Sequence, residues 1–417
     1  MVAKGMRWYL TAAMSLAPRY EQYVGTGSCG GGGFLRRWMA AISYSPRTIT
    51  TASNKPPLVS PWLKIPPVGG SHFYSLAENK VKSLLPLSSE TTDENDILCI
   101  GSSHGWLVFQ SRGIDPSIFL SNPITGHRIN LPSIHSLYHP PDDVNKRLFS
   151  IRSIILSSCP NENDCRVVII YYSRQGEKLA FCTTSGGLTT STTWTCLPSP
   201  LTDYCNIVYS RNHQLFLALT EDLDMESWDL RDPFSPKRVV IEGLKCEDVE
   251  EEWGRKERLS VQHNYLVPDD SSSNGDLFFI HRYVAEHVQP DGSVVDPTES
   301  EDHIGEDLPY KTWKFQVFKF DLTDKQLWYL DDSLEDRAIF IGLNQSFLVS
   351  AAADFHGLIP NSIYFADDYP LIPDRSFGGH DVGIYNYKDK TLKPCYFPCD
   401  PNNIKRIEPC PLWFTPN

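Results

Sequence analysis

The feature that most limits the fold of this chain is a recurring pattern of short apolar runs separated by clusters of turn-forming residues. The pattern begins near Pro56 and continues to the C-terminus. In one clear example, an apolar run at 97–100 leads to a turn at 101–105 and a second run at 106–109. Short runs bounded by Gly, Ser and Asn indicate strands. Helical spacing of apolar residues is clearest over 73–85, where it predicts one short helix.

The length of the patterned segment indicates the architecture. Residues 56–417 show no domain boundary, and a sandwich rarely needs so many strands. Propeller blades of about 40–50 residues would divide this length into roughly seven to nine units, or fewer with long insertions. Aromatic residues make up 12% of the chain, and Pro (31) and Gly (26) are frequent, as expected for short strands joined by turns. The sequence therefore predicts an all-β fold with a single β-propeller-like domain over 56–417.

Two segments allow more detailed strand predictions. Over 313–322 apolar and polar residues alternate, but the phase shifts by one residue between Val317 and Phe318. Such a slip predicts a strand that carries a β-bulge. Over 384–392 two short runs flank a polar turn, which predicts a hairpin.

The first 55 residues differ from the rest in charge. They contain seven basic residues and one acidic residue, Glu21, and no further acidic residue occurs before Glu78. A basic, acid-poor segment rich in Ser and Thr is typical of organellar transit peptides. We therefore expect 1–55 to be a disordered, basic organellar leader, with the mitochondrion favoured over the plastid. Two alternatives stay open, because the apolar run at 8–17 suits a secretory signal and the glycine run at 30–33 suits a terminus without an address.

Charge and hydropathy argue against two classes of partner. The chain has a net charge of −13, and the segment after the basic leader is more acidic still. An acidic surface repels phosphate backbones, so we expect no nucleic-acid binding. No stretch reaches about 18 apolar residues, so no membrane span is predicted. The triplet 344–346 fits the glycosylation pattern, but its place in a strand-rich segment argues against modification.

The cysteines and glycines provide no motif for a metal or cofactor. Eleven cysteines are present, and several, such as Cys99 and Cys182, lie within apolar runs, which is typical of reduced, buried thiols. Cys395 and Cys399 form one closely spaced pair, whereas a structural zinc site normally needs two. The glycine-rich segment 27–33 is not followed by Gly-Lys-Ser/Thr, so it is not a phosphate-binding loop. We expect no cofactor and no metal.

Several blocks of residues stand out in order along the chain. The first are Ser60-Pro61-Trp62-Leu63, Gly101-Ser102-Ser103-His104-Gly105-Trp106-Leu107, Leu120-Ser121-Asn122-Pro123-Ile124-Thr125-Gly126 and Leu131-Pro132. The others are Phe340-Ile341-Gly342, Pro360-Asn361-Ser362-Ile363-Tyr364-Phe365-Ala366-Asp367-Asp368 and Pro411-Leu412-Trp413-Phe414-Thr415-Pro416. Together they resemble the plant "domain of unknown function 295" family, also called the KIB-type β-propeller. The resemblance implies that the last block, 411–416, is the closing strand of the propeller. The motif residues of this resemblance are Trp62, Gly101, Gly105, Trp106, Asn122, Pro123, Gly342, Asn361, Tyr364, Asp367, Asp368 and Trp413.

The resemblance bears on function through the N-terminus. Many members of that family carry an F-box, a helical module with a Leu-Pro start that recruits a ubiquitin-ligase scaffold, and residues 1–55 contain nothing similar. Other members lack the F-box and carry an organellar leader. The chain resembles this second group, which implies that scaffold recruitment is not its activity.

The motif residues also have physical roles of their own. Gly101 and Gly105 permit the positive φ of a tight turn. Trp106 is a large apolar side chain that we expect to fill the space between two blades. Asn122 and Pro123 are expected to open a turn in which the Asn side chain binds the backbone.

One group of carboxylates raises the question of catalysis. Asp367, Asp368, Asp374 and Asp381 lie close in sequence, together with His380. Propeller glycosidases place carboxylates around the central channel as acid and base. We favour a structural role, in which Asp367 and Asp368 cap turns of a loop rich in Pro and Gly.

A second catalytic motif is also rejected. Residues 101–105 match G-x-S-x-G, the nucleophile elbow of serine hydrolases. The elbow requires a helix after the serine, and 106–109 is predicted to be a strand.

The sequence therefore predicts a non-enzymatic binding module, in which loops of a rigid propeller hold an unidentified protein partner inside an organelle. The first alternative is an adaptor for ubiquitin-dependent degradation in cytosol or nucleus. The second is a propeller-type hydrolase. The partner, the oligomeric state and the number of blades stay open.

Overall fold

The computed structural model describes residues 60–65, 72–84, 97–111, 117–137, 151–173, 175–241, 255–272, 275–289, 291–296, 308–322, 325–351, 357–368, 376–395, 406–407 and 409–416. All of them belong to one structural unit, Val59–Asn417. The leader predicted over 1–55 lies outside the described residues. No helix within these ranges is long and apolar enough to cross a membrane.

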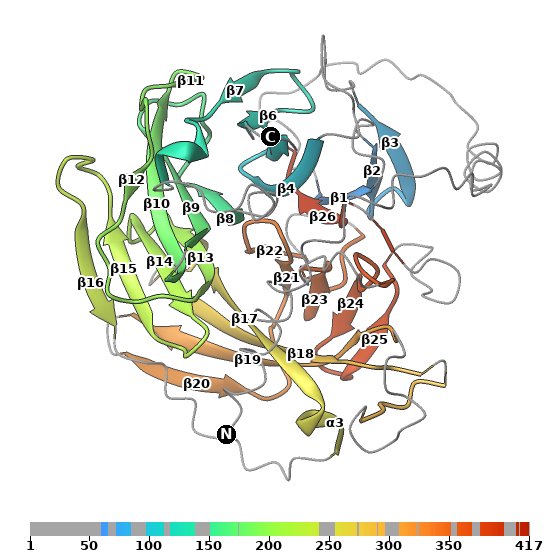
Figure 1. Cartoon of the computed structure of the whole chain (residues 1–417). Helices are drawn as coiled ribbons and strands as arrows, with labels where there is room; N and C mark the ends of the chain where they lie inside the picture. The colour runs from blue at the N-terminus through green and yellow to red at the C-terminus, as the bar shows by residue number, and fades with distance from the viewer. Residues whose placement is uncertain are drawn as a thin grey trace, which may run out of the picture. The chain divides into compact units, whose positions relative to one another are not determined.

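The strands of the described residues form six sheets that are arranged in a ring, as the blades of a propeller are (Figure 1). We name the blades A to F in chain order. Blade A contains β1 (Trp62–Ile65), β2 (His72–Ser75), β3 (Lys80–Ser83) and β26 (Leu412–Phe414). Blade B contains β4 (Ile97–Ser103), β5 (Trp106–Ser111), β6 (Ile118–Ser121) and β7 (Arg128–Asn130). Blade C contains β8 (Ile151–Leu156), β9 (Cys165–Ser173), β10 (Gly176–Ser185), β11 (Leu188–Thr189) and β12 (Thr195–Cys196).

The remaining blades complete the ring. Blade D contains β13 (Tyr204–Ser210), β14 (Leu215–Thr220), β15 (Met225–Asp229) and β16 (Lys237–Ile241). Blade E contains β17 (Ser260–Pro268), β18 (Leu277–Ala285), β19 (Lys311–Asp321) and β20 (Gln326–Leu330). Blade F contains β21 (Arg337–Ile341), β22 (Phe347–Ser350), β23 (Ser362–Phe365), β24 (Gly383–Asn386) and β25 (Thr391–Lys393). Two helical segments of one turn each, η3 (Ile134–Leu137) and α3 (Arg255–Arg258), occur among the described residues.

The predicted all-β propeller is therefore confirmed. Blades B to E are built mainly of consecutive antiparallel strands, so alternate turns of each blade lie at opposite ends. We call the end that carries the turns after the first and third strands face II, and the opposite end face I. The turns at 104–105 and 211–214 lie on face II.

The ring is closed by pairing the two ends of the domain in one sheet. The C-terminal strand β26 pairs antiparallel with β1, with Trp62 opposite Phe414 and Leu63 opposite Trp413. Both tryptophans are buried. Closure of this kind removes the free edges that an open ring would expose. It confirms the prediction that the last block of the sequence is a closing strand.

Blade F departs from the simple pattern. Its strands β21 and β23 pair in parallel, and β22 lies at the sheet edge beside β21. The segment 342–346, between β21 and β22, extends to blade B, which is not adjacent to blade F in the ring. There the Gln345 N–H donates to the Ser102 carbonyl at 2.8 Å and Ser103 Oγ donates to Gln345 Oε1 at 2.5 Å. Asn344 and Ser346, the two residues that the glycosylation pattern at 344–346 requires, are both buried in this bridge.

The hydrophobic core lies mainly between neighbouring blades. Trp106 of blade B is fully buried in a cluster that includes Ile154 and Val167 of blade C. This packing confirms the predicted role of Trp106 as the side chain that fills the space between two blades. The indole of Trp194 adds a polar link to the same cluster, donating to the Pro132 carbonyl at 2.9 Å.

The helix predicted over 73–85 is wrong. The segment forms the hairpin of β2 and β3, with a turn in which Asn79 has a φ of 49°. Phe73 packs toward blade B, whereas Leu76 and Val81 pack toward blade F. The apolar residues therefore serve two cores on opposite sides of one sheet, and their helical spacing is a coincidence.

The β-bulge predicted between Val317 and Phe318 is also misplaced. The register of β19 against β18 runs without interruption there and shifts instead at Trp313. Val317 packs in the cluster shared with blade F, whereas Phe318 packs in the cluster shared with blade D. A strand that is buried on both faces needs no alternation, so adjacent apolar residues do not indicate a slip.

Gly101 does not have the predicted positive φ. The tight turn between β4 and β5 consists of His104 and Gly105, with φ values of 48° and 77°. Gly101 lies within β4, at an irregularity of the pairing, and a Cβ there would lie 3.1 Å from the Leu343 carbonyl. Its role is therefore to allow the bridge at 342–346 to approach the strand closely.

A buried lysine offers a test of the packing between blades A and B. Lys64 is on the same face of β1 as Trp62, and its Nζ has no hydrogen-bond partner among the described residues. Burial lowers its pKa from the usual 10.5, so the folded state binds fewer protons than the unfolded state below that pH. We expect Lys64→Met to raise the free energy of unfolding by about 1–3 kcal/mol, because an unsatisfied buried group is removed. The gain should shrink as the pH approaches 10.5, where the charged form no longer favours the unfolded state.

Urea unfolding at pH 7 and pH 10 would measure both effects. Lys80→Met, at an exposed position on β3, should change the free energy by less than about 0.5 kcal/mol. A destabilised Lys64→Met protein would show that the amine has a favourable interaction in the folded state.

Candidate functional site

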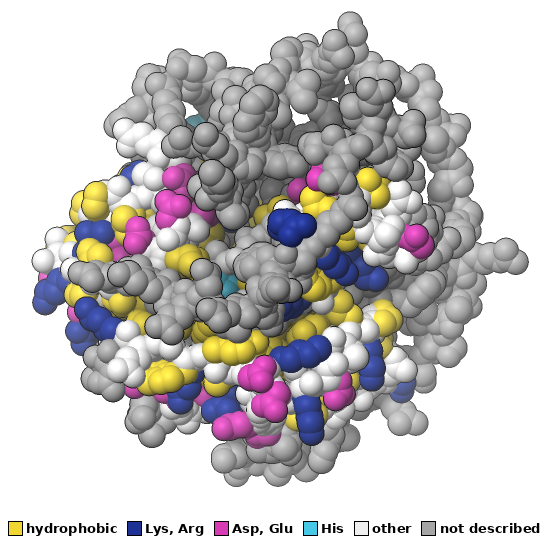
Figure 2. Space-filling view, turned by 90° about the horizontal axis from the view of Figure 1, so that it is seen from below, with side chains coloured by type: hydrophobic (Ala, Val, Ile, Leu, Met, Phe, Trp, Pro, Cys, Tyr) yellow, Lys and Arg dark blue, Asp and Glu magenta, His cyan; other side chains and the backbone are white. Residues whose placement is uncertain are grey.

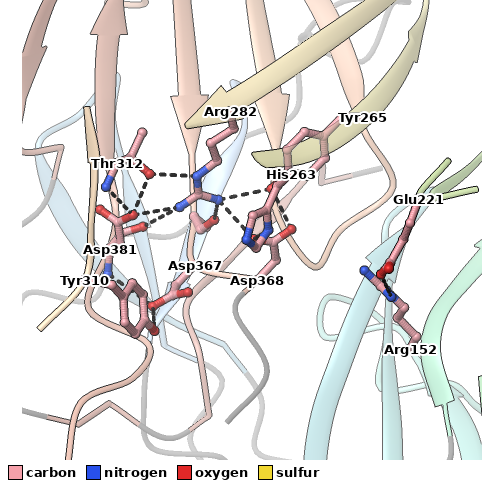
Figure 3. Close-up of polar contacts among 11 residues, drawn as sticks. Arg152, Glu221, His263, Tyr265, Arg282, Tyr310, Thr312, Asp367, Asp368 and Asp381 are labelled. Carbon is pink, nitrogen blue, oxygen red and sulfur yellow. Dashed lines mark hydrogen bonds and ion pairs between the residues drawn. The ribbon is translucent and has the colours of Figure 1, made fainter. Parts of the chain in front are cut away.

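A group of charged side chains on face I, all of them among the described residues, surrounds Arg282 of β18. The Arg282 side chain is buried, and a buried guanidinium must be paired to offset the loss of hydration. Its Nη1 donates to Asp368 Oδ1 at 3.1 Å and its Nη2 donates to Asp381 Oδ2 at 3.0 Å. Figure 3 shows the guanidinium between these two carboxylates.

The remaining donors of Arg282 are also used. Its Nε donates to Thr312 Oγ1 at 2.7 Å, and Nη1 also donates to the Ala366 carbonyl at 2.9 Å. The Thr312 hydroxyl in turn donates to Asp381 Oδ2 at 2.5 Å. Two strands of blade E and two loop segments of blade F are thereby joined through one side chain.

A second layer of aromatic residues holds the carboxylates. The Tyr265 hydroxyl donates to Asp368 Oδ2 at 2.5 Å, and the Tyr310 hydroxyl donates to Asp367 Oδ2 at 2.5 Å. His263 Nδ1 lies 3.4 Å from Asp368 Oδ1. We call Arg282, Thr312, Tyr265, Tyr310, His263 and the three carboxylates of Asp367, Asp368 and Asp381 the Arg282 cluster.

The two neighbouring carboxyls of this cluster have pKa values displaced in opposite directions. Burial, followed by the charge of Asp381, raises the pKa of Asp367. Burial also acts to raise the pKa of Asp368, but His263 and Arg282 outweigh it and hold that pKa well below its usual range. Such a separation is found in acid and base pairs of enzymes, but ion-pair networks produce it as well.

The geometry of the Arg282 cluster argues against contact with a substrate. The Asp367 side chain is fully buried, and Asp381 is nearly so. Asp381 accepts from Arg282 and from both the N–H and the hydroxyl of Thr312. Carboxylates that are enclosed and bonded in this way tie loops to the blades, whereas a glycosidase needs both groups open to the sugar.

The turn caps predicted at Asp367 and Asp368 stay a prediction, because residues 369–375, which would form the turn, lie outside the described residues. The hydrogen bonds described for them join distant segments, with Tyr310 and Tyr265 as partners. The structure brings Asp367, Asp368 and Asp381 together, as the sequence grouping indicated, and His380 is adjacent, with Nε2 at 3.0 Å from the Tyr310 carbonyl. The fifth member of that group, Asp374, lies outside the described residues.

A smaller charged group on face I joins blades C and D. Nη1 of Arg152 lies 3.2 Å from Glu221 Oε1, as Figure 3 shows. The same nitrogen lies 3.3 Å from Glu177 Oε1. Gly176, with a φ of 99°, lies so close to Asp203 that a Cβ there would be 2.3 Å from its Oδ1. Burial raises the pKa of Glu177 to about 7, and the neighbouring carboxyls of Glu221 and Asp203 add to that rise against the opposing effect of Arg152.

This pKa predicts a pH dependence of stability. Between the unfolded value of about 4.5 and the folded value of about 7, the folded state binds more protons, so stability falls as the pH rises. The total loss contributed by Glu177 should be up to about 3 kcal/mol. We expect Glu177→Gln to remove this slope and to be more stable than the wild type at pH 8.

Urea unfolding between pH 5 and pH 8 would follow the slope directly. The exposed Glu162→Gln variant should keep it. An unchanged slope in Glu177→Gln would assign the pH dependence to another group.

The other motif residues have structural positions. The Asn122 side chain opens the predicted turn, with Oδ1 accepting from the N–H groups of Ile124 at 2.9 Å and Thr125 at 3.0 Å, and Pro123 next to it is buried. Asn361 has a φ of 54°, and its Oδ1 accepts from the Leu334 N–H at 2.6 Å.

Gly342 and Tyr364 position the segments around β23. Gly342 has a φ of 147°, and a Cβ there would lie 3.1 Å from the Cβ of Ala366. The Tyr364 hydroxyl accepts from the Ile359 N–H at 2.7 Å. The serine of the G-x-S-x-G match, Ser103, is buried and is followed by β5, so the strand predicted after it is confirmed.

Sequence reasoning missed the centre of the Arg282 cluster. Arg282 occurs in the nine-residue strand β18, between apolar residues at 277–280 and 283–285. A charged residue within a run that is buried on both faces signals a buried partner, and this signal was available in the sequence. The identity of the partner was not, because Asp381 lies 99 residues away.

Comparison with known proteins supports the same fold. The family described as the KIB1-4 beta-propeller matches residues 73–386. None of the curated proteins matches the chain significantly.

Among solved structures, similarity is distant. The Dos1 propeller has 12% identity and a TM-score of 0.30, covering 64% of this chain and 56% of its own. The hydrazine synthase of Kuenenia stuttgartiensis has 10% identity and a TM-score of 0.32, covering 83% and 98%. The tricorn protease has 13% identity and a TM-score of 0.28, and the match covers 65% of this chain but only 21% of that one.

Proposed function

The chain belongs to the KIB1-4 β-propeller family, and from that premise we propose that it is a non-enzymatic module that holds a protein partner. The observation that carries the proposal is the state of the carboxylates on face I. Asp367, Asp368 and Asp381 all bind donors of the protein itself. A rigid ring whose polar groups are internally paired is suited to presenting loops to a partner.

We further propose that the protein acts inside an organelle of a plant cell, the mitochondrion before the plastid. The composition of residues 1–55 supports this location, since they carry seven basic residues, one acidic residue and many hydroxyl side chains.

Localisation and partner capture test the proposal together. The full chain with a C-terminal fluorescent tag should be found in the organelle, and a version that lacks residues 1–55 should not. Chemical crosslinking in the isolated organelle, followed by purification on the tag, should yield a partner that is absent from the truncated control.

The outcomes distinguish the alternatives. Cytosolic or nuclear signal for both versions, with binding to a ubiquitin-ligase scaffold, would replace the proposal by the degradation adaptor. Turnover of a glycoside or another small substrate that is lost in Asp368→Asn and Asp381→Asn variants that still fold would replace it by a hydrolase.

A further inference from the structure

Face II carries apolar side chains at equivalent turns of three consecutive blades. Each lies at or just after the turn that follows the third strand: Ile124 in blade B, Leu188 in blade C and Phe234 in blade D. Phe234 is 97% exposed and Leu188 is 71% exposed. Isolated exposed apolar residues are common on proteins, and Figure 2 shows hydrophobic side chains among charged and polar ones on one side of the molecule. Ile124, Leu188 and Phe234 differ from such residues because their position repeats at one end of three neighbouring blades, and we call them the apolar arc.

The arc continues onto the outer strand of blade D. In β16, Val239 is 59% exposed and the next residue, Val240, is also exposed. Adjacent residues of a strand point to opposite faces, so β16 presents apolar side chains on both of its faces. An apolar outermost strand of this kind is a surface that another chain tends to cover.

The turns of face II form a rigid platform between blades D and E. The Arg211 N–H donates to Asp270 Oδ1 at 3.0 Å, and Asn212 Nδ2 donates to the Ser272 carbonyl at 2.9 Å. His213 Nε2 lies 3.0 Å from the Gly275 carbonyl. Because these turns are already bonded to one another, a partner would bind without ordering them first.

The charge of face II changes around the ring. The segment 331–336 lies at the same end of the ring, because Arg337, which follows it directly, has its Nε 3.0 Å from Asp269 Oδ2 in the turn after β17. Among the described residues at this end of blades E and F, six exposed residues are acidic: Asp270, Asp331, Asp332, Glu335, Asp336 and Asp389. The exposed basic residues of the same turns are Lys325, Lys388 and Lys390. The apolar arc on blades B to D is therefore adjoined by a predominantly acidic half.

We propose that face II is the docking surface of this propeller, and that its partner is a protein segment that combines apolar side chains with Lys or Arg. The proposal rests on the protein-binding function above and specifies the surface and the chemistry of its partner. Apolar contacts on the arc supply affinity, and the acidic half orients a basic segment by charge complementarity. A lipid surface or a nucleic acid does not fit, because both are anionic and would be repelled by the acidic half.

Selection of peptides on the intact protein tests this surface. A displayed library of random dodecapeptides would be selected on the immobilised full chain, and enriched peptides would be synthesised for titration. Two variants change face II: Leu188→Ser with Phe234→Ser in the arc, and Asp331→Asn with Asp332→Asn in the acidic half. Two matched controls lie elsewhere: Trp328→Ser, an exposed apolar residue of β20, and Asp291→Asn, an exposed acid on face I.

We expect the enriched peptides to pair apolar residues with Lys or Arg. Each face II variant should weaken their binding at least about tenfold, as loss of central contacts does, while both controls bind as the wild type. Binding to the wild type should also weaken with salt, and this dependence should be smaller in the Asp331→Asn, Asp332→Asn variant.

In the peptide selection, the inference would be overturned by peptides without basic residues, by equal binding of face II variants and wild type, or by the lack of any enriched peptide. Self-association of the wild type that the arc variant abolishes would assign face II to a second copy instead. A partner captured from the organelle that still binds both face II variants would refute this surface and leave the binding function intact. Failure to capture any partner would count against the binding function itself.

Discussion

Replacing Arg282 with Met is expected to lower the free energy of unfolding by about 3–5 kcal/mol, the cost of breaking a buried ion pair by removing one partner. The substitution would leave Asp368 and Asp381 without their cation, and both carboxylates have little access to water. It would also release the links from Arg282 to Thr312 and to the Ala366 carbonyl. Urea unfolding followed by tryptophan fluorescence would measure the change.

Two further variants make this prediction specific. Arg282→Lys should recover only part of the loss, because an ammonium cannot reproduce the planar fork that reaches both carboxylates. Arg152→Met, in the more exposed pair with Glu177 and Glu221, should cost about 1 kcal/mol. Equal effects of Arg282→Met and Arg152→Met would mean that the Arg282 cluster contributes no more to stability than the more exposed ion pairs of Arg152.

Trp413→Ala is expected to destabilise the protein by a similar amount, about 3–5 kcal/mol, because it removes a large buried side chain and leaves a cavity. Trp413 is fully buried in the closing strand β26, and its ring lies 5.1 Å from Phe340 and 5.8 Å from Tyr364. The cavity would therefore lie between blades A and F, where the two ends of the domain are joined. Thermal unfolding and urea unfolding would both report the loss.

The matched control is Trp328→Ala, at an exposed position on β20. It should change the free energy of unfolding by less than about 0.5 kcal/mol, since surface substitutions away from special features are usually neutral. A small effect of Trp413→Ala would show that the closing strand is not needed to hold the ring together. Proteolysis at the C-terminus of the folded protein would then be expected to leave the remaining blades intact.

Strand content could be predicted because each strand carries its own local signal. The hairpin at 384–392 was identified from two short runs around a polar turn, and it is present as β24 and β25. The turn at Asn122 can be predicted because Asn side chains bind N–H groups of residues that follow closely in sequence, as Asn122 does with Ile124 and Thr125. Signals of this kind lie within a few residues, so a single sequence contains them in full.

The sequence-based predictions are wrong at residues whose packing partners belong to another blade. Phe73 and Val81 have helical spacing, yet they pack against different blades on opposite sides of one sheet. Gly101 was assigned to a turn, yet its lack of a side chain accommodates Leu343, which is distant in sequence. Neither error could be avoided from the local sequence pattern alone, because the same pattern is compatible with the predicted and with the observed structure.

The all-β class and the single propeller domain can be predicted from the sequence, because periodicity and turn residues lie within short segments of the chain. The residues that close the ring are indicated by the resemblance of the last block to a closing strand. The Arg282 cluster and the set of side chains on face II are formed only in the folded protein, so local sequence pattern does not predict them. Arg282 meets Asp381 across 99 residues, and the turns that carry Leu188, Phe234 and Asp331 become one surface only when the blades form a ring. Burial and pairing depend on the neighbours of a residue in the folded protein. In a propeller many of these neighbours belong to blades that are distant in sequence.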